Sequence, residues 1–204
     1  MKGRDIRLFS LSLQTTGLEE QDDIIEWAAA YTLGDDVREC DVLVRSARRS
    51  DPDALRCHGI TAERLAAGGV PRDEGMSLLH SLLRRRASEG YWLVCANLAF
   101  AMPMLRANLV RAGFDPDDVA STLDALRGFD VIAADRLLRE DTQGMGRSLP
   151  ALAAAWSTPT QPTRRASDKA RVQLELAAVQ RRAFTVGDDR LLAMLDAERE
   201  RMER

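Results

Sequence analysis

The order of apolar and polar positions along the first 44 residues predicts three strands. Apolar and small polar residues alternate over residues 6–13 and end at Thr-Thr-Gly, and two further apolar segments, 24–33 and 37–44, are separated by Gly34-Asp35-Asp36. Alternation with period two, and a short glycine-containing turn between apolar runs, are typical of strands joined as hairpins. We therefore expect a three-stranded antiparallel meander.

Helical spacing alternates with short apolar runs in the rest of the chain. Thr61 is a hydroxyl N-cap for a helix over residues 61–67, and Met76, Leu79 and Leu83 recur at helical spacing in residues 73–87. The runs 91–95 and 129–133 predict buried strands, and helices are expected over 102–112, from Asp135, and over 149–156, 167–182 and 188–204. The pattern predicts an α/β fold, a mixed sheet flanked by helices.

Charge is balanced in total but uneven along the chain. The 204 residues hold 29 Lys and Arg and 32 Asp and Glu, a net charge of -3, which excludes the basic excess of a protein that coats nucleic acid without specificity. Residues 15–41 hold nine acids and one arginine, net -8, whereas residues 163–182 hold six basic residues and two acids, net +4. A local basic surface near residues 163–182 is therefore expected.

Cysteine use and the amino-terminal residues indicate the compartment. Cys40, Cys57 and Cys95 form no CxxC pair, so we expect neither a disulfide framework nor a zinc site, and a reducing cytoplasm is the expected location. Four of the first seven residues are charged, unlike a signal peptide, and the longest uncharged stretches, 91–105 and 149–163, are interrupted by Asn or Pro. No membrane association is expected.

Four short motifs follow one another along the chain. They are Leu13-Gln14-Thr15-Thr16-Gly17-Leu18, Ile25-Glu26-Trp27-Ala28, His58-Gly59-Ile60-Thr61 and Val94-Cys95-Ala96-Asn97-Leu98-Ala99-Phe100. In this order they resemble the DEDD 3′-5′ exonuclease family, in its histidine-bearing DEDDh branch, which includes the proofreading epsilon subunit of bacterial DNA polymerase III. The resemblance covers residues 5–182. It implies a ribonuclease H-like fold in an exonuclease-like domain of residues 1–182, followed by a C-terminal amphipathic helix within 183–204.

The resemblance also implies a metal site, whose residues this chain replaces. The family's chemistry uses two divalent cations held by four carboxylates, with a histidine as general base. The matching positions hold Ser12, Gln14, Ala101 and Lys169 in place of the carboxylates, Arg164 in place of the base, and Ala96 in place of the histidine before Asn97. Asp168 is one residue from the required position, which turns its side chain by about 100° around a helix. We therefore predict a degenerate site with no catalytic residue, no metal and no cofactor.

Loss of four carboxylates and gain of a lysine suit direct binding of phosphate. The candidate nucleic-acid-binding residues are Thr15, Thr16, Gly17, Leu18, His58, Asn97, Phe100, Arg164, Arg165 and Lys169. The predicted function is metal-independent binding of a single-stranded nucleic-acid end or a nucleotide, without cleavage. An active exonuclease with unorthodox ligands, which would need Mg²⁺ or Mn²⁺, is an alternative.

The first alternative, ahead of the active exonuclease, is a protein-interaction module in a DNA replication, repair or RNA-processing assembly. The last helix carries Leu191, Leu192, Met194, Leu195 and Met202, and it would dock on its own core, on a protein partner or on a second copy. Structural explanations also stay open for Ser12 and Gln14 as plain strand residues, for Arg164 and Lys169 on a solvated face, and for His58 as a turn residue near the cleft. The run at residues 84–86 is expected to be a solvated helix face.

Overall fold

A five-stranded mixed sheet lies at the centre of the computed structural model, which describes residues 7–34, 36–139 and 147–202. Its strand order is β3-β2-β1-β4-β5. The strands are β1 (Leu8–Thr15), β2 (Ile24–Leu33), β3 (Asp36–Leu43), β4 (Trp92–Cys95) and β5 (Arg127–Asp130). The first three pair antiparallel, while β4 runs parallel to β1 and β5 runs parallel to β4. The predicted meander and the mixed sheet are confirmed.

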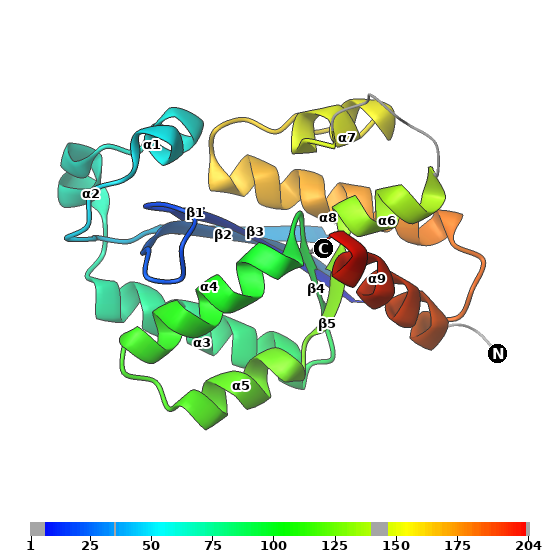
Figure 1. Ribbon diagram of the computed structural model, residues 1–204, viewed down its shortest axis with the longest axis horizontal. Helices are drawn as coiled ribbons and strands as arrows, with labels where there is room; N and C mark the ends of the chain where they lie inside the picture. The colour runs from blue at the N-terminus through cyan, green and yellow to red at the C-terminus, as the bar shows by residue number, and fades with distance from the viewer. Residues whose placement is uncertain (1–6, 35, 140–146, 203–204) are drawn as a thin grey trace.

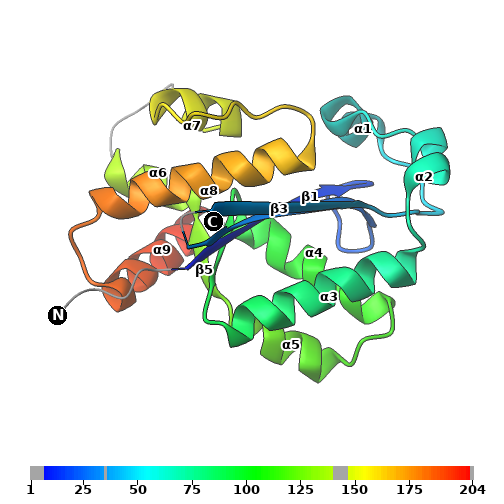
Figure 2. The same cartoon turned by 180° about the vertical axis from the view of Figure 1, so that it is seen from behind.

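Helices cover both faces of the sheet (Figures 1 and 2). One face carries α3 (Arg72–Ser88), α4 (Leu98–Arg111) and α5 (Pro116–Asp124), and the other carries α6 (Val131–Leu138), α7 (Leu149–Ala155) and α8 (Ala166–Ala183). The short helices α1 (Pro52–His58) and α2 (Ala62–Gly68) lie at one end, and α9 (Asp188–Met202) lies beside β5. A separate hydrophobic cluster fills each side of the sheet, so the predicted α/β class is confirmed.

The alternation of β1 decides which of its side chains meet α8. Phe9 and Leu11 point into the cluster between the sheet and the helices α3 and α4, and Ser10 between them points to the opposite face, where its hydroxyl donates to the carbonyl of Ala170 over 2.5 Å. Small side chains on both elements, with Ala166 and Ala170 fully buried, let α8 lie close against the sheet. Ser12 therefore shares the face of the sheet that α8 covers.

One predicted strand ends earlier than expected. Residues 129–133 were expected to be extended, but β5 ends at Asp130, whose carboxylate accepts hydrogen bonds from the amides of Ile132 and Ala133 and starts α6 at Val131. The same carboxylate accepts from the amide of Leu98 over 2.7 Å. A buried apolar run fits a strand and a helix equally well by period, and an N-cap within it decides between them.

Three further helices differ from the sequence expectation, either in being present or in where they begin. The helices α1 and α5 were not predicted, although each follows an Asp-Pro pair, which suits a helix start with proline in the first turn. In α5 the cap is real, because Asp115 accepts from two backbone amides. The helix α4 begins at Leu98, before the expected residue 102, because the Asn97 side chain accepts from the amide of Phe100.

The structure confirms the predicted helix over residues 61–67 and contradicts part of the prediction for the arginine run at residues 84–86. The helix is confirmed, and the Thr61 hydroxyl accepts from the amide of Arg64. The expectation of a solvated face at 84–86 is wrong for Arg86, which is buried with its guanidinium 3.7 Å from the centre of the Tyr31 ring and its Nη1 2.6 Å from Glu89. A delocalised cation that stacks on an aromatic ring is buried at lower cost than a free one.

The last helix packs against the rest of the chain. Leu191 and Leu195 of α9 are buried in the same cluster as Val131 of α6 and Phe129 of β5. These apolar residues therefore dock on the chain's own core, and association with a partner or a second copy through this helix stays a prediction. The side chain of Met202, which was expected to dock with this helix, lies outside the described part of the structure. Within the described residues no helix is long and apolar enough to cross a membrane.

Candidate functional site

A cavity of about 330 Å³ opens at the carboxyl ends of β1 and β4. Parallel strands bring these ends to one edge of the sheet, which is where α/β folds usually place their ligand sites. The lining residues come from β1, from the end of β4 and the start of α4 that follows it, from α7 and the segment after it, and from α8. They are Leu11, Ser12, Leu13, Cys95, Ala96, Asn97, Phe100, Ala101, Leu149, Pro150, Pro162, Thr163, Lys169 and Gln173.

The cavity gathers several of the candidate residues from distant parts of the chain. Ser12, Ala101 and Lys169, which hold three of the family's four carboxylate positions, all line it, as do Asn97 and Phe100. The remaining candidates do not line it and lie elsewhere: Gln14, Thr15, Thr16, Gly17, Leu18, His58, Arg164 and Arg165. A binding role for these residues stays a prediction.

Lys169 is the cation of this cavity. It lies in the first turns of α8 and is half-buried, and burial lowers the pKa of its ammonium, although interactions with Cys57 and Glu26 partly oppose this shift. No salt bridge joins Lys169 to an acid within the described part of the chain. A partly desolvated cation without a bonded counter-ion attracts an anionic ligand. Placement in the cavity therefore argues against the plain solvated face for Lys169, whereas Arg164 and Arg165 are exposed.

Two neighbouring polar side chains of the sheet hold the start of α8. Gln14 and Glu26 are paired across β1 and β2. Gln14 donates from Nε2 to the carbonyl of Arg164 over 3.0 Å, and Glu26 accepts from the amide of Ala166 over 3.2 Å. Burial raises the pKa of Glu26, and the Ala166 amide and the charge of Arg64 partly offset the rise. These contacts place Lys169 at the cavity by fixing the residues just before it.

His58 is a buried turn residue beside the site. It ends α1, and its Nδ1 accepts a hydrogen bond from the amide of Ile60 over 2.9 Å, across Gly59 in the left-handed conformation with φ of 70°. Burial, followed by the positive charge of Lys169, lowers the pKa of His58, and the backbone of Thr15 partly opposes this. A neutral imidazole whose Nδ1 is occupied agrees with the structural interpretation of this residue.

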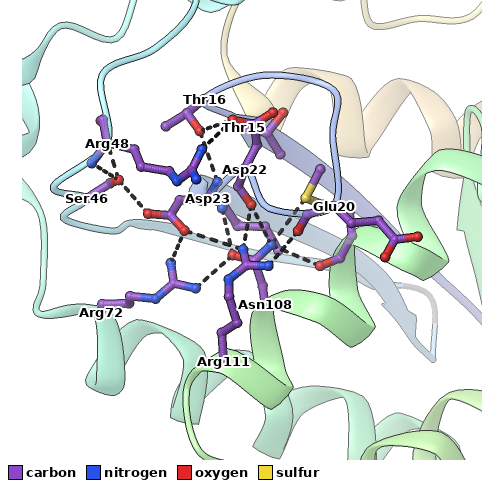
Figure 3. A network of polar contacts seen from close by, with 12 residues as sticks. Thr15, Thr16, Glu20, Asp22, Asp23, Ser46, Arg48, Arg72, Asn108 and Arg111 are labelled. Atoms are coloured by element: carbon purple, nitrogen blue, oxygen red, sulfur yellow. Dashed lines mark hydrogen bonds and ion pairs between the residues drawn. The ribbon is translucent and has the colours of Figure 1, made fainter.

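The loop after β1 is closed by a network of carboxylates and arginines (Figure 3). Asp22 accepts from the Thr16 hydroxyl and from the amide of Glu19, and Asp23 lies 3.0 Å from Nη1 of Arg72 and 3.4 Å from Nη2 of Arg111. These acids belong to the stretch of net charge -8, yet they are paired. The negative charge that the sequence places near the site is therefore partly neutralised.

The same network determines which part of the Thr-Thr-Gly-Leu motif is accessible. Thr16 and Gly17 are buried, and a Cβ at Gly17 would collide with the carboxylates of Asp22 and Asp51. The Thr15 hydroxyl donates to the carbonyl of Gly17 over 2.6 Å. Leu18, by contrast, is 79% exposed. The loop thus presents the apolar side chain of Leu18 to solvent on a hydrogen-bonded backbone.

The side chains of the cavity do not fit a pair of divalent cations. Mg²⁺ and Mn²⁺ prefer carboxylate oxygens, and the lining residues that the structure describes supply an ammonium, hydroxyls and amides but no carboxylate. Asp168 accepts from the Thr163 hydroxyl over 2.5 Å and does not line the cavity. Among the residues that the structure describes, no three His, Cys, Asp or Glu side chains gather as a metal site.

Sequence reasoning missed several lining residues of the cavity, among them the polar side chain of Gln173. Gln173 follows Lys169 by four residues on α8, a spacing that places two side chains on the same face of a helix. That spacing was the available signal, but no motif pointed to residue 173.

The architecture is that of the ribonuclease H-like 3′-5′ exonucleases, so the predicted fold is confirmed. The structure of E. coli exonuclease I in complex with a dA16 oligonucleotide is 18% identical and matches with a TM-score of 0.74, over 93% of this chain and 42% of that chain. Exonuclease I from Methylocaldum szegediense is 19% identical and matches with a TM-score of 0.71, over 87% of this chain and 40% of that chain. Exonuclease X in complex with 5′ overhanging duplex DNA is 19% identical and matches with a TM-score of 0.62, over 92% of this chain and 99% of that chain.

These comparisons support the resemblance at the level of the fold. The chain spans about two fifths of the length of the exonuclease I structures and nearly the whole of exonuclease X. No protein-family model and no curated protein matches the chain. The narrower likeness to the proofreading epsilon subunit stays a prediction.

Proposed function

We propose that this chain binds the end of a single-stranded nucleic acid, or a free nucleotide, without a metal ion and without cleaving it. The observation that carries the proposal is that Lys169 lines the cavity together with Ser12 and Ala101, at positions where the resembled family holds metals with carboxylates. A lysine there supplies positive charge to a phosphate directly, so binding does not need a cation as a bridge.

The other lining groups suit the remaining parts of a nucleotide. The Phe100 ring offers a face on which a base stacks, a contact that tolerates any base sequence. The Asn97 amide nitrogen and the Ser12 hydroxyl are donors for phosphate or sugar oxygens. Structural neighbours support this choice of ligand, because exonuclease I has been solved with dT13 and dA16 oligonucleotides.

The described residues of the cavity do not supply the groups that would activate water for cleavage. Phosphodiester hydrolysis in the family depends on two metals that generate a nucleophile and stabilise the leaving oxygen. Among the described residues, the cavity lining offers no carboxylate to hold them, and His58, the histidine of the motifs, is buried outside the lining with Nδ1 occupied. The chain is therefore proposed to be a binding module of the exonuclease fold.

Titration of short 5′-labelled DNA and RNA oligonucleotides by fluorescence anisotropy tests this function. At low salt with EDTA present, the protein is expected to bind, and affinity should fall as salt rises because Lys and Arg contacts release counterions. The Lys169→Met variant should bind at least about tenfold more weakly. A matched control is Arg182→Met, an exposed basic residue of the same helix, which should bind like the wild type.

Two results would contradict the proposal. One is no binding of any oligonucleotide or nucleotide at low salt. The other is Mg²⁺- or Mn²⁺-dependent release of nucleotides from a 3′ end that disappears in Lys169→Ala, which would instead establish an active exonuclease with unorthodox ligands.

A further inference from the structure

We infer that Gln173 selects the ligand of the cavity by accepting a hydrogen bond from a donor that lies one helical turn away from the bound phosphate. The donor is a sugar hydroxyl or an exocyclic amino group of the base. This inference rests on the proposed function, because it assumes that Lys169 binds the phosphate.

Gln173 has an unpaired acceptor in a buried position. Its side chain lines the cavity and is 5% exposed, and its Oε1 has no hydrogen-bond partner among the described residues. Buried polar atoms in folded proteins are almost always paired, since leaving one unpaired costs the loss of its hydration. A ligand in the cavity is the group that can supply the missing donor.

A second glutamine of α8 shows what a structural role looks like. Gln180 is fully buried, and its Nε2 donates to the carbonyl of Val131 over 3.1 Å, which ties α8 to α6. Its Oε1 is also unpaired, but Gln180 does not line the cavity. Gln173 has no such tie to a neighbouring element among the described contacts, so its amide is available to a ligand.

The spacing on α8 relates the two groups to one ligand. Lys169 and Gln173 are four residues apart and line the same cavity, so they are separated by about 6 Å along the helix axis. One sugar ring separates the phosphate of a nucleoside 5′-monophosphate from its 3′-hydroxyl, a span of similar size. A nucleotide with its phosphate at Lys169 therefore brings its sugar or base edge to Gln173.

The polar groups of the cavity offer such a ligand both hydrogen-bond donors and a hydrogen-bond acceptor. The Asn97 carbonyl oxygen already accepts from the amide of Phe100, and the Cys95 thiol already donates to the carbonyl of Leu11. The groups that remain available are the Asn97 amide nitrogen and the Lys169 ammonium, and both are hydrogen-bond donors that suit phosphate oxygens. The Gln173 acceptor does not suit a phosphodiester oxygen, which carries no proton, and so it favours a nucleotide over a bare phosphate group.

Calorimetric titration of the full chain with nucleoside 5′-monophosphates, in EDTA, tests the inference. AMP, GMP and CMP are each compared with the analogue that lacks the exocyclic amino group and with the 2′,3′-dideoxy analogue. The wild type is expected to lose about tenfold in affinity when the donor that meets Gln173 is removed. If dideoxy analogues alone bind weakly, the donor is a sugar hydroxyl; if deaminated analogues alone do, it is the base amino group.

The variants separate this inference from the proposed function. Gln173→Leu should abolish the discrimination while Lys169-dependent binding persists, and Gln180→Leu should leave the discrimination unchanged. Equal affinities for all analogues in the wild type, or unchanged discrimination in Gln173→Leu, would overturn the inference and leave the proposed function standing. The wild-type comparison decides even if a variant fails to fold. No binding of any monophosphate would overturn both.

Discussion

Gln14 donates a hydrogen bond from Nε2 to the carbonyl oxygen of Arg164 over 3.0 Å. The resembled family has a metal-binding glutamate at the position of Gln14, and a carboxylate has no proton with which to make this contact. The amide thus fastens β1 to the segment that leads into α8, and this contact gives Gln14 a definite structural role instead of that of a plain strand residue.

Gln14→Glu should therefore destabilise the protein without restoring metal-dependent activity. The substitution sets a buried carboxylate against a carbonyl oxygen, which is expected to lower the free energy of unfolding by about 1–3 kcal/mol at neutral pH. Urea denaturation measures the change, and Gln21→Glu in the exposed loop is the control. A variant as stable as the wild type that also releases nucleotides with Mg²⁺ would contradict this account of Gln14.

Lys169→Met should separate stability from binding. Removing a partly desolvated ammonium relieves the cost of burying charge, so the free energy of unfolding is expected to stay within about 0.5 kcal/mol or to rise. Ligand affinity should nevertheless fall. Urea denaturation of the variant beside Arg182→Met makes the comparison, and a loss of several kcal/mol would show that Lys169 is a structural cation instead.

The stability of the wild type should rise with pH in the alkaline range relative to Lys169→Met. Burial holds the pKa of Lys169 below its ordinary value of 10.5, so between these two pKa values the unfolded chain binds more protons than the folded one. Unfolding then becomes less favourable as pH rises through this window. Urea denaturation of both proteins at several alkaline pH values measures the difference, and a slope of the opposite sign would show that folding raises the pKa.

Ligand affinity should fall over the same alkaline window, because a neutral amine cannot pair with a phosphate. Affinity should therefore decline at a lower pH than an ordinary lysine would give. Titrations with one nucleotide across this range provide the measurement. An affinity that stays constant up to pH 10.5 would argue against Lys169 as the phosphate contact.

The carboxylate of Asp22 should be essential for the loop after β1. Asp22→Ala removes the acceptor of the Thr16 hydroxyl and of the Glu19 amide, and it leaves Arg48 without this partner. The expected loss in the free energy of unfolding is about 2–3 kcal/mol. Glu20→Ala, at an exposed position of the same loop, should change it by less than about 0.5 kcal/mol. Similar losses for both variants would contradict a specific role of Asp22.

Local patterns accounted for most of the fold and for part of the site. The strands over residues 24–33 and 37–44 and the cap at Thr61 were predictable because their signals lie within a few residues of one another. The motifs also predicted that Ser12, Ala101 and Lys169 belong to one site, and all three line the cavity. Parallel pairing of β1 and β4 places the carboxyl ends of these two strands together beside it.

The remaining features depend on contacts between distant segments. Arg72 and Arg111 neutralise Asp23 only because α3 and α4 pack beneath the sheet, and no spacing in the sequence encodes that meeting. The unpaired acceptor of Gln173 likewise becomes visible only when the surroundings of the buried amide are known. The start of α6 was missed because its cap, Asp130, lies inside an apolar run that reads as one strand.

We propose that phosphate binds Lys169 in a cavity that holds no metals. The most direct test is a crystal structure determined from crystals of the protein soaked with Mn²⁺ and a nucleoside monophosphate. Anomalous scattering locates manganese independently of the protein density. We expect phosphate density at the Lys169 ammonium and no manganese peak between Ser12 and Ala101. Two manganese ions bound there, with the nucleotide phosphate bridging them, would contradict this proposal.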